Sequence, residues 1–455
     1  MVKARQIKGR LLLANVVVAL AGGLLISCAG EQKALREPPR RPNVILISID
    51  TLRPDHLGCY GYDRETSPSL DALCEEAVVF EETIAQAPST LHSHASMFTS
   101  LLPHHHQATW AAKTRIPEAA VTVAEVFQQA GYRTAAFTGG GQMDRVFGLD
   151  QGFEVFEQPV SQRFEGTVWK GVEWLESDDP RPFFLFLHSY EAHLSYTPRP
   201  EYMAVFDEGY SGDLPDEIDL ELIDRINEGE IEFDLDSDLR HLIAAYDSEI
   251  RSADDGLANL LWYLREHDLY DETLIVFTSD HGEEFGEHGK FGLHSHTLFD
   301  ELLRVPLVVK FPGSEHAGTR VGQQVRSIDI PATLVMAAGI QAPDQFTGTD
   351  LRQLLSSQQV DELVAISRLD SPPGQRGKTS ARTRRWKLVQ GELHDLLHDP
   401  GEQWYASPSA ESAAEGEILE EALRQALEAR EAFPLEVVAP SDSTLDELRA
   451  LGYIQ

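Results

Sequence analysis

The stretch "NVILISID", residues 43–50, decides the fold class of this chain. It is a continuous apolar run without alternating polar residues, which is typical of a strand covered on both faces. Such strands occur in parallel sheets that lie between layers of helices. The run ends at Asp50, and polar residues that follow parallel strands mark the sheet edge where ligands bind.

Similar runs recur along the chain, and helical patterns separate them. The clearest helical pattern is an apolar stripe from Leu239 to Leu264. Strands that alternate with helices predict an α/β fold, with a mostly parallel sheet sandwiched by helices. The further predicted strands are Thr134 to Phe137, Phe183 to His188, Leu274 to Thr278 and Pro306 to Phe311.

The pattern divides the chain after its N-terminal region into two parts. We expect a catalytic domain at 42–358, interrupted at about 201–240 by an acidic insertion with fifteen Asp or Glu residues and only two arginines. That insertion is either a lid or cation-attracting rim, or a solvated excursion, which we favour. The segments "RRWKLVQ" and "ELHDLLHD" predict a small antiparallel subdomain within 359–455, followed by helices around 411–432 and 443–451.

The first residues have the features of a targeting segment. A basic start, "MVKARQIKGR", precedes the apolar "LLLANVVVALAGGLLIS", which predicts a signal peptide at 1–27, with an uncleaved anchor helix as the alternative. Leu25-Ile26-Ser27-Cys28 resembles the bacterial lipobox, which predicts lipidation of Cys28 and a tether at 28–41. We therefore expect a lipid-anchored protein of the bacterial cell envelope, periplasmic or at the cell surface.

Charge and cysteine content limit the partners. The formal net charge is −36, and removal of residues 1–27 would take away four basic residues and no acid. A polyanion would be repelled, which argues against nucleic acid as a partner. After lipidation of Cys28 only Cys59 and Cys74 remain, and the sequence leaves open whether they pair or stay free.

Three predicted strands end in residues that can bind a metal ion. Asp50 ends the first run, "LIVFTSDH" ends at Asp280 and His281, and "FFLFLHSYEAH" delivers His188 and His193. Carboxylate and imidazole ligands together suit zinc or manganese, and less specifically calcium. We expect Gly282, which follows His281, to let the backbone turn sharply past the site.

The stretch "TLHSHASMFTSLL" begins with hydroxyl groups and continues as a helix. The N-terminus of a helix presents backbone N–H groups and the positive end of its dipole, which suits a tetrahedral oxyanion such as phosphate or sulfate. The alternative is a Ser/Thr cap without chemistry. The next run, His104–His106, is expected in a surface loop.

Four motifs together resemble the sulfatase family of the alkaline phosphatase superfamily. They are "RPNVILISIDTLRPDHLGCYGY", "TLHSHASMFTSLLPHHH", "LIVFTSDHGEEFGEHG" and "LHSHTLFDELLRVPLVV", in the family's order and approximate spacing. The resemblance runs from about Arg41 to Gln403. It implies the alkaline phosphatase/sulfatase-like fold and a metal-dependent hydrolase.

The nucleophile segment departs from the family pattern C/S-x-P-S-R, which here reads Thr90-Leu91-His92-Ser93-His94. In the family the cysteine or serine is oxidised to formylglycine. Thr90 cannot give that aldehyde, because its β-carbon already bears a methyl group. His94 stands where the family has arginine.

The metal-binding positions of the family can be matched one by one. Asp50 matches the first metal aspartate, Thr51 takes the place of the second, and Asp280-His281 takes the place of an Asp-Asn pair. The resemblance is to superfamily members that use threonine and one metal ion on phosphorus, although the metal count stays open. It implies one divalent ion on Asp50, Thr90, Asp280 and His281.

The resemblance also implies the roles of other residues. Thr90 would attack the ester and His193 would protonate the leaving oxygen, with His94 as a further catalytic residue. Substrate-contacting or supporting residues would be Thr51, Ser93, His294 and His296.

We expect a hydrolase that cleaves a phosphate, phosphonate or sulfate ester of a small molecule, glycan or lipid through Thr90. One alternative is a sulfuric ester hydrolase, or a transferase that passes the group to a cell-surface glycan or lipid. The other is an inactive binding protein that kept the fold. The sequence leaves open the natural substrate, the preferred ester, the metal and the oligomeric state.

Overall fold

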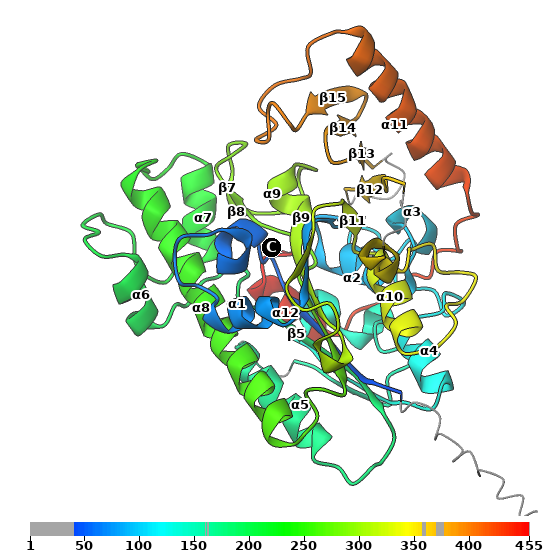
Figure 1. Ribbon diagram of the computed structural model, residues 1–455. Coiled ribbons are helices and arrows are strands. Elements are labelled where there is room, and N and C mark those ends of the chain that lie inside the picture. The colour runs from blue at the N-terminus through cyan, green and yellow to red at the C-terminus, as the bar shows by residue number, and fades with distance from the viewer. Residues whose placement is uncertain (1–40, 160, 162, 357–360, 370–376, 455) are drawn as a thin grey trace, which may run out of the picture. The chain divides into compact units, whose positions relative to one another are not determined.

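A central sheet of nine strands organises the chain (Figure 1). Its strand order is β10-β2-β9-β6-β1-β5-β3-β4, and β11 also pairs with β2. The strands are β1 (Asn43–Ile49), β2 (Val78–Ile84), β3 (Arg133–Phe137), β4 (Val155–Glu157), β5 (Phe183–Ser189), β6 (Thr273–Thr278), β9 (Arg304–Lys310), β10 (Thr319–Val321) and β11 (Val325–Arg326).

This computed structural model describes residues 41–454, apart from 160, 162, 357–360 and 370–376. The predicted signal peptide at 1–27, the lipidation site Cys28 and the tether up to residue 40 lie outside the described residues. Among the helices of the described part, none is long and apolar enough to cross a membrane.

The sheet is mostly parallel, as the sequence predicts. Strand β9 runs antiparallel to its neighbours β2 and β6, and the other pairs in this sheet are parallel. In the middle, Ser48 of β1 is in register with His188 of β5 and Thr278 of β6. These three strands therefore end at one edge, and the residues that follow them meet there.

The side chains of β1 alternate between two hydrophobic cores. Ile45, Ile47 and Ile49 pack on the side of α1 (Pro68–Glu75), α5 (Phe164–Leu175) and α8 (Ser237–Glu266). Val44 and Leu46 pack on the other side, with α2 (Thr90–Thr99), α4 (Val123–Gln129) and α10 (Asp329–Ala337). Each of these side chains is fully buried and contributes about 1.5–3 kcal/mol. Helices on both faces confirm the predicted sandwich.

The remaining elements of this region are short. They are α3 (Pro103–His106), α6 (Pro200–Phe206), α7 (Leu220–Asn227), α9 (Asp300–Leu303), the β7–β8 hairpin (Glu284–Phe285 with Phe291–Leu293), and 3₁₀ turns η1 (Pro54–His56), η2 (Gly58–Tyr60), η3 (Gly141–Met143), η4 (Arg145–Phe147), η5 (Pro312–Ser314) and η6 (Leu351–Leu355). The expected surface loop at His104–His106 is wrong: these residues form α3, and His105 and His106 are buried because α3 packs against α2.

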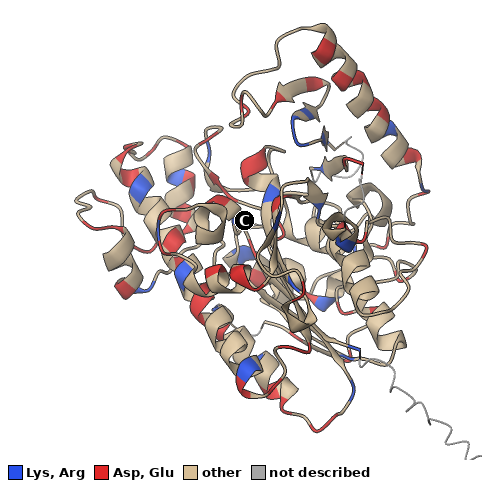
Figure 2. Cartoon of the chain, viewed as in Figure 1, with Lys and Arg blue, Asp and Glu red and all other residues tan. Residues whose placement is uncertain are grey.

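The acidic insertion contains α6, α7 and the start of α8. Most of its carboxylates face solvent, while Ile223 and Ile226 of α7 are buried against the rest of the chain. In Figure 2 the positions of Asp and Glu residues are red along these helices and along α11 (Ala410–Glu428). The insertion is thus a solvated layer that still contributes to the core.

A four-stranded antiparallel sheet follows, which confirms the predicted C-terminal subdomain. Its order is β12-β13-β14-β15, and α11 packs on β13 and β14. The strands are β12 (Ala365–Arg368), β13 (Thr379–Arg382), β14 (Trp386–Val389) and β15 (Glu392–Asp395), and a last helix, α12, covers Asp442–Ala450.

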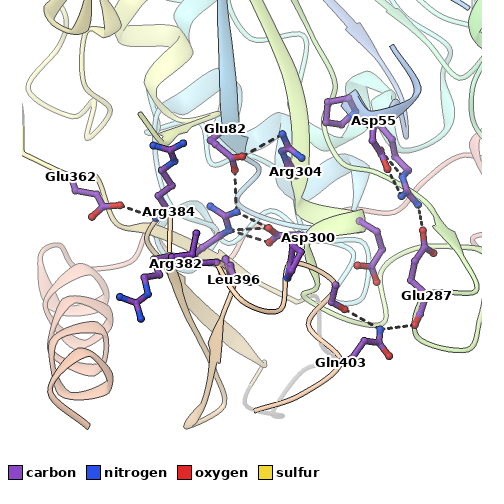
Figure 3. Close-up of a pocket in the computed structure, with 17 residues that line it drawn as sticks. Asp55, Glu82, Glu287, Asp300, Arg304, Glu362, Arg382, Arg384, Leu396 and Gln403 are labelled. Carbon is purple, nitrogen blue, oxygen red and sulfur yellow. Dashed lines mark hydrogen bonds and ion pairs between the residues drawn. The ribbon is translucent and has the colours of Figure 1, made fainter. Parts of the chain in front are cut away.

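Buried ion pairs attach this small sheet to the catalytic region. Asp300 of α9 accepts hydrogen bonds from Arg382 (2.7 Å) and Lys387 (2.8 Å), and Lys387 also pairs with Glu402. Figure 3 shows Arg382 between Asp300 and Glu82. Asp300, Arg382 and Glu82 border a cavity of about 670 Å³ whose lining also includes Arg304.

Candidate active site

The carboxyl edge of the sheet brings two acidic side chains and one imidazole together. Asp50 follows β1, and Asp280 and His281 follow β6, which is the neighbour of β1. One oxygen or nitrogen atom from each of the three lies within 4.8 Å of the others, and all three residues are buried. The register of the parallel strands therefore builds the cluster that the strand ends predict.

Thr90 joins this cluster as the first residue of α2. Its hydroxyl donates to Asp50 Oδ2 at 3.2 Å, and Oγ1 lies 3.4 Å from His281 Nε2. The backbone N–H of Leu91 at this helix start donates to Gln142 Oε1 at 3.0 Å. The hydroxyl thus lies between the carboxylates and the positive end of the α2 dipole.

The carboxylates have the electrostatics of a cation site. Asp50 Oδ1 and Asp280 Oδ2 are buried and have no hydrogen-bond partner among the described residues. Burial, together with the neighbouring Asp280 carboxylate, raises the pKa of Asp50 well above its usual range. Two buried carboxylates at this separation cannot both stay ionised without a positive charge between them. The donor set therefore fits a divalent cation.

The orientation of His281 agrees with this set. Nδ1 donates to the carbonyl oxygen of Gly282 at 3.0 Å, which leaves the lone pair of Nε2 directed toward Thr90 and the carboxylates.

Gly282 serves a purpose other than the expected sharp turn. A Cβ atom on Gly282 would lie 2.0 Å from the carbonyl oxygen of Glu301, so this position requires close backbone approach.

His94 lies behind Thr90, one turn along α2. Its Nδ1 donates to the carbonyl oxygen of Thr90 at 2.9 Å, and Nε2 hydrogen-bonds with Ser48 Oγ at 3.0 Å. Burial lowers the pKa of His94, so the ring is neutral and Ser48 donates to it. Both nitrogen atoms are thereby engaged in holding the start of α2 against β1, and a direct catalytic role for His94 stays a prediction.

Ser93 and Thr51 support the backbone around the cluster. Ser93 Oγ donates to the carbonyl oxygen of Asp280 at 2.7 Å, which ties α2 to the loop after β6. Thr51 has a positive φ of 56°, which is uncommon for a β-branched residue. Its hydroxyl donates to the carbonyl oxygen of Ala192 at 2.7 Å rather than pointing toward Thr90.

The other predicted histidines, His193, His294 and His296, lie next to this cluster or beyond it. His193 Nε2 lies 3.1 Å from His294 Nε2, and the rings of His294 and His281 are 4.4 Å apart. His193 Nδ1 donates to the carbonyl oxygen of Leu194. Burial lowers the pKa of His193 to about 4. His296 is more distant, since its Nε2 pairs with Glu284 at 2.7 Å.

Two further residues contact the cluster, although the family resemblance implies no role for either. His188 Nε2 lies 3.4 Å from Asp50 Oδ2, so it orients that carboxylate. Tyr453 Oη lies 2.8 Å from Thr90 Oγ1 and 3.1 Å from His193 Nε2. A strand-end position was a signal for His188, whereas no local pattern marks Tyr453.

The charged cavity of Figure 3 is separate from this cluster. Its described lining contains neither Thr90 nor the three residues of the candidate cation site. Four of its lining arginines pair with carboxylates, namely Arg53, Arg304, Arg382 and Arg385. The candidate active site is therefore the cluster at Thr90 rather than this cavity.

A mostly parallel sheet that presents carboxylates, imidazoles and a helix-starting hydroxyl at its carboxyl edge defines a class of α/β hydrolases that cleave esters at a preformed centre. The chain matches the Sulfatase family over residues 42–340, and the C-terminal region of N-sulphoglucosamine sulphohydrolases over residues 286–429. The chain belongs to the sulfatase family, and with it to the alkaline phosphatase superfamily.

Characterised relatives resemble most of the chain at low identity. An N-acetylglucosamine-6-O-sulfatase of Bacteroides thetaiotaomicron is 23% identical over 431 residues, which covers 76% of this chain and 75% of the relative. A multifunctional alkaline phosphatase superfamily protein of Trinickia caryophylli is 25% identical and covers 70% of this chain and 77% of its own.

Solved structures share the fold. The structure of BT4656 in complex with its substrate D-glucosamine-2-N,6-O-disulfate superposes with a TM-score of 0.71 at 19% identity, covering 86% of this chain and 99% of the other. The phosphonate monoester hydrolase of Agrobacterium radiobacter gives a TM-score of 0.67 at 20% identity, covering 86% of this chain and 96% of the other. The chain is thus a hydrolase of the type that acts on sulfate or phosphonate esters.

Proposed function

We propose that this protein hydrolyses a sulfate, phosphonate or phosphate ester through the unmodified hydroxyl of Thr90. The observation that carries the proposal is the position of Thr90 Oγ1, which hydrogen-bonds to Asp50 at 3.2 Å and lies 3.4 Å from His281 at the start of α2. A hydroxyl becomes nucleophilic when a neighbouring group takes its proton or stabilises its charge. Family members use this position for attack, which supports the same role for Thr90.

A divalent ion, zinc, manganese or calcium, is the proposed cofactor. Asp50, Asp280, His281 and Thr90 would hold it, because the ligand atoms of the first three lie within 4.8 Å of one another and Asp50 Oδ1 and Asp280 Oδ2 have no hydrogen-bond partner among the described residues. When bound, it would lower the pKa of the Thr90 hydroxyl and offset the charge of the carboxylates. His188 and His94 orient Asp50 and Thr90 from behind.

The reaction balances as a double displacement. Thr90 Oγ1 forms a bond to sulfur or phosphorus while the bond to the leaving oxygen breaks, and Asp50 Oδ2 takes the proton of the Thr90 hydroxyl. His193 Nε2 carries no proton while Nδ1 donates to Leu194, so it would take one from solvent water and relay it to the leaving oxygen. Water then cleaves the Thr90 ester, which releases the acid and restores the hydroxyl.

The substrate is proposed to be the ester of a glycan, lipid or small molecule. The family relatives include enzymes named for sulfated sugars and for phosphonate monoesters, so both classes of ester are candidates. The replacement of the formylglycine precursor by Thr90 and of arginine by His94 favours phosphorus esters. Transfer of the group to an alcohol instead of water is the alternative, and it would use the same covalent step.

Thr90 is tested by its own substitution. We expect Thr90→Ala to reduce turnover of nitrophenyl phosphate, a nitrophenyl phosphonate monoester and nitrophenyl sulfate by more than about 10³-fold. Thr99→Ala, at the other end of α2, should leave turnover nearly unchanged. Mass analysis of wild type quenched during turnover should find the added group on the peptide that contains Thr90. Turnover that survives Thr90→Ala would remove Thr90 from the mechanism.

We further propose that lipidation of Cys28 anchors the enzyme to a membrane of the bacterial cell envelope. The motif Leu25-Ile26-Ser27-Cys28 supports it, because several acyl chains together give stable anchoring. Cys28→Ala should move the protein from the detergent phase to the aqueous phase in Triton X-114 partitioning, whereas Cys59→Ala should not. Aqueous partitioning of the wild type would contradict the anchor.

A further inference from the structure

The proposed nucleophile has no solvent-exposed surface in this structure. Thr90, Asp50, Asp280 and His281 are each 0% exposed. A substrate that must bring sulfur or phosphorus to within about 3–3.5 Å of Thr90 Oγ1 cannot reach it in this state. Besides Asp50 and His281, the Thr90 hydroxyl contacts Tyr453, which follows the last helix α12.

The side chain of Tyr453 lies between Thr90, the proposed nucleophile, and His193, the residue proposed to protonate the leaving oxygen. Its Oη lies 2.8 Å from Thr90 Oγ1 and donates to His193 Nε2 at 3.1 Å. In an in-line displacement the transferred group lies between the nucleophile and the residue that protonates the leaving oxygen. The Tyr453 hydroxyl thus occupies the position of the sulfuryl or phosphoryl group.

The helix α12 and a few specific contacts hold Tyr453 there. Thr444 Oγ1 donates to Asp144 Oδ2 at 2.7 Å, and Glu447 Oε2 accepts from the backbone N–H of Gly141 at 2.9 Å. Tyr453 N–H donates to the carbonyl oxygen of Leu448 at 2.9 Å, which folds the last residues back over α12. Figure 1 shows the C-terminal end at the centre of the view.

The residues before α12 are anchored separately. Phe433 N–H donates to the carbonyl oxygen of His105 at 2.9 Å, and Val438 N–H to that of Lys113 at 2.8 Å. Residues 433–438 therefore stay on the catalytic domain when α12 moves. Pro440 and the N-cap Ser441 separate this anchor from α12. Residues 441–454, which we name the closing segment, can swing out as one unit.

A cavity beside the closing segment ends short of the nucleophile. It has a volume of about 490 Å³ and is lined by Tyr190, His193 and Glu249 on one side and by Glu447, Ala450 and Leu451 of the closing segment on another. Thr90 is not among its described lining residues. Displacement of the closing segment would join this cavity to the reactive centre.

We propose that the closing segment is an autoinhibitory strap whose Tyr453 hydroxyl takes the place of the substrate's sulfuryl or phosphoryl group. The proposal rests on the proposed function, because it requires Thr90 and His193 to flank the transferred group. Each substrate molecule must displace the segment. The apparent affinity for substrate therefore equals the intrinsic affinity multiplied by the fraction of protein molecules in which the segment is open. Release of the segment opens the active site.

Hydrogen exchange with orthovanadate tests the displacement without turnover. Vanadate is a tetrahedral oxyanion and competes with Tyr453 for the same place. We expect amides of residues 444–453 to exchange faster when vanadate is bound, while amides of 433–438 are unchanged. Unchanged or slower exchange of 444–453 in the presence of bound vanadate would overturn the proposal.

Substitutions that loosen the segment provide the second test. Thr444→Ala removes the hydrogen bonds of its hydroxyl with Asp144 and Ser441, and Glu447→Ala removes those of its carboxylate with Gly141 and Ser443. Each variant should raise kcat/KM for a nitrophenyl ester roughly three- to tenfold. Tyr453→Ala should raise it at least as much and tighten vanadate binding. Asp446→Ala, on the exposed face of the same helix, should change neither value. If Tyr453→Phe and Tyr453→Ala both lowered kcat tenfold, Tyr453 would be a catalytic residue, and the proposal would be overturned.

The two proposals fail in different ways. If the loosening variants tighten vanadate binding but Thr90→Ala retains turnover, the closing segment still covers an oxyanion site, whereas the proposed nucleophile, and with it the assignment of Tyr453 to the place of the transferred group, falls. If Thr90→Ala abolishes turnover and vanadate leaves exchange of residues 444–453 unchanged, the proposed function stands and the strap falls.

Discussion

Asp50 Oδ2 accepts a hydrogen bond from Thr90 Oγ1 at 3.2 Å, although 40 positions separate the two residues in the chain. The other Asp50 oxygen and Asp280 Oδ2 have no hydrogen-bond partner among the described residues. The Thr90 hydroxyl alone does not neutralise this pair, and burial makes the uncompensated charge costly. We therefore expect a positive ion bound at these two carboxylates to stabilise the folded protein.

Metal ions should stabilise the wild type, and Asp280→Asn should abolish most of this stabilisation. At a metal concentration 100 times the dissociation constant, the gain is about 2.7 kcal/mol. Without metal, Asp280→Asn should be at least as stable as wild type, because it removes the like charge next to Asp50. Calorimetric melting with and without zinc, manganese or calcium measures both effects.

Asp254→Asn provides the matched control for a buried aspartate. Asp254 accepts hydrogen bonds from the backbone N–H groups of Ser69 and Leu70 and lies outside the metal cluster. This variant should melt lower but keep the full metal-dependent shift. An equal metal shift in Asp280→Asn and wild type would contradict the assigned ligands.

His94 should affect catalysis by positioning Thr90. His94→Gln loses the hydrogen bond to the Thr90 carbonyl oxygen, and we expect kcat to fall roughly 10²-fold with little change in KM. In His94→Asn the shorter amide can replace Nδ1 and donate to the same carbonyl oxygen, so more of kcat should remain. Steady-state kinetics of both variants distinguish this role from substrate binding, in which KM would rise for both.

The buried lysine at the base of the small sheet should be important for stability. Lys387 is fully buried and pairs with Asp300 and Glu402. Lys387→Met leaves both carboxylates without this partner, and we expect a loss of about 3–5 kcal/mol in denaturant unfolding. Arg385→Ala, which breaks the more exposed pairs with Asp395 and Glu411, should cost less than about 1 kcal/mol. Similar losses for the two variants would contradict the burial argument.

Glu249 should make stability decline as the pH rises from its unfolded pKa toward 8. Burial and the nearby Glu191 carboxylate raise the pKa of Glu249 to about 8. A carboxyl whose pKa is raised on folding contributes stability below its unfolded pKa, and this contribution is lost as pH rises toward 8. Each pH unit in this window removes up to about 1.4 kcal/mol.

The comparison with Glu249→Gln isolates this effect. The variant keeps an acceptor for the backbone N–H of Thr197 and cannot ionise, so its melting temperature should decline less than that of wild type between pH 6 and 8. Glu173→Gln, on an exposed side chain, should follow the wild-type curve. Parallel curves for wild type and Glu249→Gln would show that Glu249 does not titrate in this range.

Much of the scaffold and of the candidate site could be predicted from local patterns. The run at 43–50 identified a strand buried on both faces, and the polar ends at Asp50 and Asp280-His281 identified the edge where they meet. Strand β2 escaped detection, because "VVFEETI" mixes apolar and charged residues next to the subdomain. The run His104–His106 was misjudged, since polarity predicts exposure only when no neighbouring element covers the residue.

By itself, the sequence determined the layered sheet and the residues at its edge that are of types able to bind a metal ion. Both can be read from the sequence because the apolar pattern of a strand and the residues that end it are properties of neighbouring positions. Only the tertiary structure decided which groups face Thr90. His188 turned out to point at Asp50, and Tyr453 reaches Thr90 across 363 positions. Packing of distant segments sets such contacts, and no local pattern in the chain encodes them.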